Sequence, residues 1–294
     1  MKIKKQIEYK IDDRGTEKVR SEIEFDTNEN IIHQIDYYES GEIFQEQEYN
    51  FENGKLNFEK HWNEYGDCVV IEYQYDQNGY PINKTTKYQD GSFESEIRKI
   101  SDLKEIIENY DVDNQLVHKQ IIIYESQNKA LSNEFYDEET LIETNKYHYD
   151  QNGNLKKRIS HNIIEDTKFI YNFEEYFEGE YKIESEKITN ENGDSLSLEL
   201  EYYQDDVLHK FEREDYQNSD QKFIWNYEIE EGLVIKETKK DSNGNIWYLV
   251  KYFYNKFRNL EKAITFDTES NYIAGTGSKI GNKNVILYRY EYFK

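Results

Sequence analysis

Apolar and polar residues alternate over short segments along the chain. Near the start, Ile3, Ile7, Tyr9 and Ile11 share the odd-numbered positions, whereas charged or amide side chains fill the even ones. Residues 69–75 repeat this alternation. Because successive side chains of a β-strand point to opposite faces of a sheet, the pattern predicts strands with one apolar and one charged face.

Turn-like clusters of Gly, Asn and Asp separate these segments at regular intervals. About 20 of them lie between Gly15 and Asn259, one for roughly every 13 residues, as expected for hairpins of short strands. Asn-Gly and Asp-Gly accept the positive φ angles of tight hairpin turns. Strands joined by such short turns run antiparallel and lie side by side, so the pattern predicts a long antiparallel β-meander.

A flat sheet of about 20 strands would leave its apolar face in water, which the hydrophobic effect and the twist of strands both oppose. We therefore expect an all-β protein whose sheet curls into a spiral or shell, or folds over into two layers. The repeat covers residues 1–294, which indicates a single repetitive domain. Its longest interruption, residues 267–284, is expected to be a loop.

Two heptapeptides, residues 73–79 and 147–153, share the pattern Y-x-Y-D-x-N-G, and looser copies end at Gly54, Gly193 and Gly244. This pattern resembles the YD repeat of Rhs-type proteins, and the degenerate period resembles the MORN-like repeats of some bacterial antitoxin and immunity proteins. The resemblance implies β-hairpins in which Tyr and Asp end a strand and Asn-Gly forms the turn. In Rhs proteins such repeats build a secreted shell around a toxin, but this sequence shows no protease or toxin segment. The residues expected to form structural turns are Tyr75, Asp76, Asn78, Gly79, Tyr149, Asp150, Asn152, Gly153, Gly54, Gly193 and Gly244.

The composition supports a folded chain. It contains 28 Tyr, 15 Phe and 3 Trp but one Pro, and aromatic residues suit half-buried strands. The formal net charge of -24 repels nucleic acids and anionic membranes and attracts cationic surfaces. We therefore expect a basic protein partner and neither a nucleic acid nor a membrane.

Residues that carry chemistry do not form a recognisable motif. The six histidines are scattered, and the single cysteine, Cys68, excludes an internal disulfide and a thiolate metal site. The D-x-N-G turns lack the spacing of a calcium loop. Residues 274–284 are rich in Gly but lack the spacing of a phosphate-binding loop. We expect no metal, no cofactor, no catalytic residue and no enzymatic activity.

The first 15 residues contain basic side chains but no uninterrupted apolar stretch, so they indicate neither a signal peptide nor a membrane anchor. A transmembrane barrel would need an apolar outer band and an export signal, and the sequence shows neither. The expected location is the cytoplasm.

Acidic runs that include aromatic residues are the most distinctive surface feature, at residues 174–181, 211–216 and 226–232. They are typical of a solvated face that keeps a sheet soluble, or of a docking face for a basic protein. On the second interpretation the partner-binding residues are Glu174, Glu175, Tyr176, Glu178, Glu212, Glu214, Asp215, Glu228, Glu230 and Glu231.

The leading functional hypothesis is a non-catalytic binding protein of the immunity or antitoxin kind, which sequesters a basic toxin or effector domain. A structural or surface repeat module related to YD-repeat shells is the first alternative. A hydrolase acting in a groove of the sheet is the second, and two inward carboxylates with perturbed pKa values in a cleft would favour it.

Overall fold

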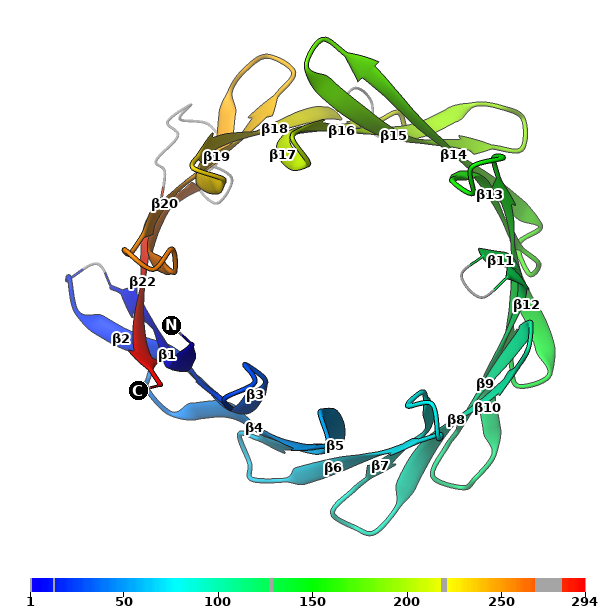
Figure 1. Cartoon of the computed structure of the whole chain (residues 1–294), viewed down its shortest axis with the longest axis horizontal. Coiled ribbons are helices and arrows are strands. Elements are labelled where there is room, and N and C mark those ends of the chain that lie inside the picture. The colour runs from blue at the N-terminus through cyan, green and yellow to red at the C-terminus, as the bar shows by residue number, and fades with distance from the viewer. Residues whose placement is uncertain (1, 13, 127–128, 218–220, 268–281, 294) are drawn as a thin grey trace, which may run out of the picture. The chain divides into compact units, whose positions relative to one another are not determined.

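The computed structural model describes residues 2–12, 14–126, 129–217, 221–267 and 282–293. These residues form 22 β-strands and no helix (Figure 1). The strands are β1 (Ile3–Ile11), β2 (Glu17–Phe25), β3 (Ile31–Tyr37), β4 (Ile43–Glu52), β5 (Lys55–Asn63), β6 (Cys68–Tyr75), β7 (Pro81–Lys87), β8 (Phe93–Ser101), β9 (Lys104–Tyr110), β10 (Leu116–Ser126), β11 (Lys129–Asp137), β12 (Thr140–Tyr149), β13 (Leu155–Asn162), β14 (Thr167–Glu178), β15 (Tyr181–Asn190), β16 (Ser195–Gln204), β17 (Val207–Asp215), β18 (Gln221–Glu230), β19 (Leu233–Asp241), β20 (Ile246–Tyr254), β21 (Leu260–Asp267) and β22 (Asn282–Tyr292). The all-β meander predicted from the sequence is therefore confirmed.

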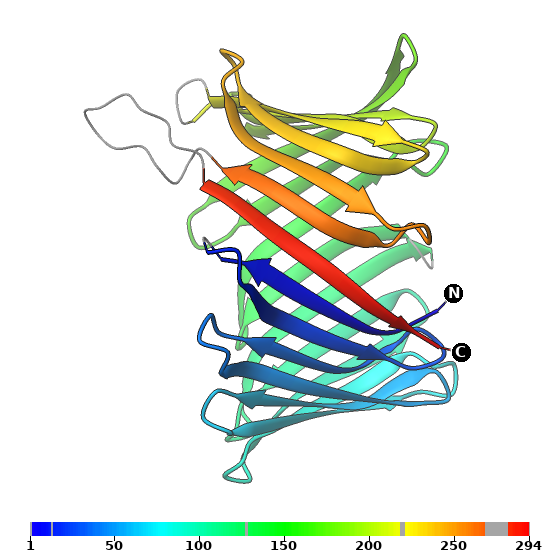
Figure 2. The ribbon, with the colours of Figure 1, turned by 90° about the vertical axis from the view of Figure 1, so that its left-hand side faces the viewer.

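The first and last strands of the meander pair with each other. β1 pairs with both β2 and β22, and the Phe293 N–H donates a hydrogen bond of 3.1 Å to the Lys2 carbonyl. Figure 2 shows β1 and β22 side by side. Of the expected spiral, shell or folded-over sheet, the spiral that stays open and the folded-over sheet are therefore wrong, because the sheet closes on itself. Closure satisfies the N–H and C=O groups that two terminal edge strands would leave unpaired.

The chain divides into two compact units, residues 1–144 with 287–294 and residues 145–286. The same hairpin pattern runs through both, and the single repetitive domain expected over residues 1–294 stays a prediction. Most of the expected loop at 267–284 lies outside the described residues, and its last three residues belong to β22.

The YD motif forms a five-residue turn. The Asp76 N–H donates to the Tyr80 carbonyl and the Gly79 N–H to the Asp76 carbonyl, while the Asp76 carboxylate accepts the N–H groups of Asn78 and Tyr80 at 2.9 and 2.8 Å. Only Gly79 has a positive φ, of 89°. The Asp or Asn side chain thus caps the turn, and the Gly supplies its one left-handed residue. Side-chain caps of the same kind occur at Asp12, Asp26, Asn63, Asp111, Asp150, Asn190, Asp241 and Asn255.

A second kind of turn has two residues. Asn53 and Gly54 both have positive φ, 51° and 77°, and join Glu52 to its cross-strand partner Lys55, as in a type I′ hairpin. Gly54 therefore belongs to a different turn from Gly79, although the sequence suggests the same motif. The two tight copies are equivalent, since the turn at Gly79 joins β6 to β7 and the turn at Gly153 joins β12 to β13.

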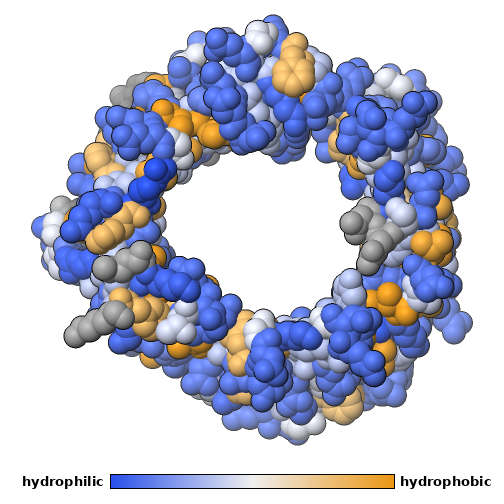
Figure 3. Space-filling view, in the orientation of Figure 1, coloured by the Kyte–Doolittle hydropathy of each residue, from blue (hydrophilic) through white to orange (hydrophobic). Residues whose placement is uncertain are grey.

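The faces of the sheet mix apolar and polar side chains, so the expected separation into an apolar and a charged face is wrong. Val69 and Ile71 do share a face of β6, but their cross-strand partners on β5 are His61 and Glu59. The Tyr73 hydroxyl on the same face donates to Glu59 Oε1 at 2.5 Å. In Figure 3, which looks onto the ends of the strands, hydrophobic residues are scattered among hydrophilic ones. Among the described residues, the hydrophobic side chains that are almost fully buried are Ile183, Val250 and Ala263.

Candidate functional site

A groove of about 580 Å³ lies within residues 145–286, a size typical of ligand-binding pockets. It runs over one face of β14, β15 and β16, beside the turn that joins β12 to β13. Its lining residues are Tyr149, Gly153, Asn154, Leu155, Lys156, Phe173, Glu174, Glu175, Glu184, Ser185, Glu186, Glu199 and Glu201. We call the sheet face that carries Glu175, Glu184 and Glu201 the groove face.

Strand register brings the carboxylates of this groove together. Glu184 on β15 lies opposite Glu175 on β14 and opposite Glu201 on β16. Glu186 lies opposite Glu199. Directly opposed residues have Cβ atoms only about 5 Å apart, and like charges in such pairs destabilise a sheet.

Two cations compensate part of this charge. Lys182 Nζ lies 2.7 Å from Glu184 Oε1 and 3.2 Å from Glu175 Oε2, and these hydrogen bonds raise the pKa of Lys182. Arg213 lies 3.4 Å from Glu199. Lys156 also lines the groove and the charge of Arg158 acts on Glu186, but six glutamates line the groove, so these four cations leave it with a net negative charge.

Glu186 is the carboxyl in the groove with a raised pKa. Burial is the main cause, and the negative charges of Glu199 and Glu201 add to it, while Arg158 opposes it. Arg158 itself stacks on the Tyr171 ring, with 3.8 Å between its guanidinium carbon and the ring centroid. Its buried Nε has no hydrogen-bond partner within the described part of the chain. This end of the site therefore combines an acid whose pKa is raised with an incompletely satisfied cation.

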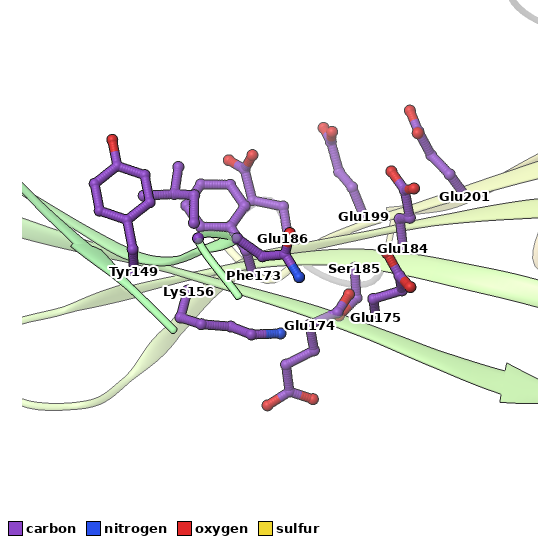
Figure 4. Close-up of a pocket in the computed structure, with 13 residues that line it drawn as sticks. Tyr149, Lys156, Phe173, Glu174, Glu175, Glu184, Ser185, Glu186, Glu199 and Glu201 are labelled. Atoms are coloured by element: carbon purple, nitrogen blue, oxygen red, sulfur yellow. The ribbon is translucent and has the colours of Figure 1, made fainter. Parts of the chain in front are cut away.

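The aromatic side chains lie at the same end of the groove as Glu186, whose cross-strand partner is Phe173. Figure 4 shows the rings of Tyr149 and Phe173 at one end and the carboxylates of Glu184, Glu199 and Glu201 toward the other. This arrangement is complementary to a Lys or Arg side chain. The aromatic rings can contact its apolar stem, and the carboxylates can bind its charged tip.

The structure does not bring all the predicted partner-binding residues together. Glu175 lies on the groove face. Asp215 lies there too, because its cross-strand partner Ser197 is on the same face of β16 as Glu201. The other strand residues of the set lie on the opposite face: Glu174, Tyr176, Glu178, Glu212, Glu214, Glu228 and Glu230. Glu231 lies in the turn between β18 and β19.

Glu212 illustrates how cations neutralise the opposite face from within the chain. It is only 7% exposed and forms ion pairs with Lys210 and with Lys222, the latter at 2.7 Å. Burial favours its neutral form, but the two lysines outweigh this and lower the pKa of Glu212. Lys222 also contacts Glu214 at 2.8 Å. These two carboxylates already have cationic partners, so they offer little to an external one.

The sequence interpretation missed Glu184, Glu186, Glu199 and Glu201. Their signal was the spacing E-x-E, which occurs on both sides of the turn at residues 190–194. That spacing places two carboxylates on one face of each strand. Their opposition across strands depends on a register shift between Ile188 and Thr189, which the spacing does not reveal.

Neither a metal site nor a membrane-spanning helix is found in the described ranges. They contain no group of three or more His, Cys, Asp or Glu side chains arranged to hold a metal ion. They also contain no helix with the length and hydrophobicity needed to cross a membrane.

Comparison with known proteins identifies no family. No family model matches the chain, and no curated protein matches it. Among solved structures, it is similar to a porin-like protein from Bacteroides uniformis, at 8% identity and a TM-score of 0.32, over 98% of this chain and 96% of that one. It is also similar to the structure of TcdB2-TccC3-TEV, at 12% identity and a TM-score of 0.25, over 85% of this chain but 18% of that one. Both TM-scores are too low to carry an argument about fold or function.

Proposed function

We propose that this chain is a non-catalytic binding module of the immunity or antitoxin kind, which sequesters a basic toxin or effector domain. The observation that supports this most is the opposition of Glu184 to Glu201 and of Glu186 to Glu199 within one groove. A cationic side chain placed between such a pair would relieve its repulsion. The free chain therefore retains an unfavourable interaction that a basic partner removes.

The aromatic end of the groove supplies the second part of the recognition. Tyr149 and Phe173 border the carboxylates, and aromatic residues at the edge of a charged pocket commonly anchor protein partners. A guanidinium or ammonium group that enters the groove would contact ring faces and carboxylates together.

The charge of the whole chain acts on the approach of the partner. A net charge of -24 steers a basic protein toward the surface and raises its association rate at low ionic strength. Binding should therefore weaken as salt is added, because exposed charges are screened beyond about 10 Å at 0.1 M salt.

The test is affinity purification of the tagged chain from its native cells at low and at physiological salt, followed by mass spectrometry. We expect a basic protein that dissociates as salt increases. A variant with Glu184, Glu186, Glu199 and Glu201 all changed to Gln should retain much less of it. The control variant changes four exposed residues in or next to turns, Glu29, Glu52, Glu138 and Glu139, to Gln.

The two variants carry the same net charge and differ only in where charge is removed. If the control loses the partner as completely as the groove variant, the groove is not the binding site. If wild-type chain retains no basic protein even at low salt, the proposed function is wrong. Where a basic protein is retrieved, co-expression with this chain should show whether the chain protects cells from that protein's toxicity.

A hydrolase acting in the groove is the second candidate. Glu186, with its raised pKa, lies opposite Glu199, and a carboxyl of raised pKa beside a second carboxyl is an arrangement that general acid/base catalysis uses. Turnover of a glycoside or peptide substrate that disappears in Glu186→Gln would favour this candidate over the binding module.

A further inference from the structure

Strand β14 extends beyond its neighbour β13. β14 pairs with β13 only from Thr167 to Asn172, whereas it pairs with β15 from Phe169 to Glu178. The end of the β14–β15 hairpin therefore has a strand on one side only (Figure 1). Residues 174–178 form a local sheet edge within a sheet whose terminal strands are paired.

The hairpin geometry shows which backbone groups this edge presents. Glu178 and Tyr181 flank a two-residue turn, and residues that flank such a turn exchange N–H and C=O hydrogen bonds. Because hydrogen-bonded pairs alternate along an antiparallel ladder, Tyr176 also points its backbone groups toward β15. The N–H and C=O groups of Glu175 and Phe177 consequently point outward, where the described residues provide no strand to pair with them.

The side chains along this edge are exposed and acidic. Phe177 is 73% exposed and Tyr176 is 41% exposed. Glu174 and Glu178 are exposed and make no side-chain hydrogen bond or ion pair with another described residue, whereas Glu175 shares Lys182. Residues 174–178 contain none of the Lys or Pro residues with which sheet edges are usually protected against pairing.

The charge of the edge selects its occupant. A second copy pairing edge to edge would place three glutamates against three glutamates, and like charges that face each other across strands are destabilising. An extended segment with Lys or Arg at alternate positions would instead present them all on one face, where Glu174 and Glu178 lie on either side of Tyr176. The groove opens beside this edge, since Glu174 and Glu175 also line it.

We infer that the outer edge of β14, residues 174–178, binds an extended basic segment of the partner as an additional β-strand. This inference rests on the proposed function and specifies how the basic partner is held. The partner backbone hydrogen-bonds to Glu175 and Phe177, as in other cases of strand addition. Its alternate basic side chains lie on one face of the added strand, beside Glu174 and Glu178.

The test uses a labelled peptide of about ten residues in which Lys and Thr alternate, and measures its affinity by fluorescence anisotropy. Phe177→Pro removes the N–H group that points outward. This N–H does not point toward β15, so the substitution keeps the pairing of β14 with β15. Edge positions of a sheet tolerate Pro. Phe177→Ala is the matched control, because it removes the same side chain and keeps the N–H. We expect Phe177→Ala to bind within about threefold of wild type and Phe177→Pro to bind about tenfold more weakly.

A second probe avoids any change to the protein. The same peptide with alternate backbone nitrogens methylated keeps its charge but cannot pair as a strand, and it should bind about tenfold more weakly to wild-type chain. Hydrogen exchange provides the structural measurement: the amides of Glu175 and Phe177 should become protected when the unmethylated peptide binds.

The outcomes separate this inference from the proposed function. If methylation and Phe177→Pro leave peptide affinity unchanged while the four groove Gln substitutions abolish it, strand addition is wrong and the acidic binding site stands. If the peptide does not bind but a basic protein is still retrieved from cells, the extended segment is wrong and the proposed function stands. A wild-type dimer that Phe177→Pro converts to a monomer would show a second copy at the edge, and would overturn the inference.

Discussion

Glu184 of β15 lies directly opposite Glu201 of β16 on the groove face, and Glu175 flanks the pair on the next strand. Lys182 bonds to Glu184 and Glu175, whereas Glu201 accepts a hydrogen bond from the Tyr203 hydroxyl at 2.5 Å. Glu212 on the other face has two lysines. Glu201 and Glu212 thus differ in how completely cations within the described residues neutralise them.

Glu201→Gln should stabilise the free chain. Gln can still accept the Tyr203 hydrogen bond, while the repulsion with Glu184 disappears. We expect a gain of about 0.2–1 kcal/mol in the free energy of unfolding, measured by urea denaturation at low salt. The gain should shrink at high salt, and Glu230→Gln, an exposed glutamate on the opposite face, should change little. A loss of stability in Glu201→Gln would show that the pair is not repulsive.

Glu212→Gln should destabilise the chain, because Lys210 and Lys222 would lose their shared buried partner. We expect a cost of about 2 kcal/mol, measured by the same urea method. The pKa of Glu212 is lowered in the folded chain, so its contribution is present above the unfolded pKa of about 4.3 and is lost as pH falls through the lower folded value. The stability difference between wild type and variant should therefore vanish in acid. A difference that persists there would exclude this ion pair as its cause.

Gly79→Ala and Gly91→Ala should cost similar amounts. Both glycines have a positive φ, 89° and 88°, which L-residues adopt at a cost of about 1 kcal/mol. An added Cβ would lie 2.7 Å from Lys55 Nζ at Gly79 and would meet nothing at Gly91. Because the end of a Lys side chain moves easily, thermal denaturation should show comparable decreases in Tm. A much larger decrease for Gly79→Ala would show that Lys55 is held rigidly.

Tyr124 should resist ionisation in alkali. Burial and a hydrogen bond to Glu105 raise its pKa to about 12. The stability that this provides is present below the unfolded pKa of about 10 and is lost as pH rises through the folded value. Tyr124→Phe removes this loss, so its stability should decline less steeply in that range. Ultraviolet titration of the phenolates in wild type and variant measures the pKa directly, and a Tyr124 value near 10 would contradict the assignment.

Much of the architecture could be predicted because it is encoded locally. Asp76 and Gly79 form their turn through hydrogen bonds and a φ angle within five residues, so the motif reveals it. The closing of the sheet could not be predicted, since no turn joins β1 to β22 and the pairing partners stand at opposite ends of the sequence.

The groove shows the same division. The E-x-E spacing at 184–186 and 199–201 by itself determines that each pair of glutamates shares a strand face. Only the tertiary structure decides that Glu184 faces Glu201, because the register shift beside Thr189 moves the pairing by one residue. Without that shift Glu184 would lie opposite Leu200, since a one-residue slip in register carries every side chain of a strand to the other face. The sequence alone determined the strands, the turns and the acidic character of this chain. The tertiary structure decided where the carboxylates meet and which edge of β14 stays open, because register and strand overhang are set by pairing partners that are distant along the chain.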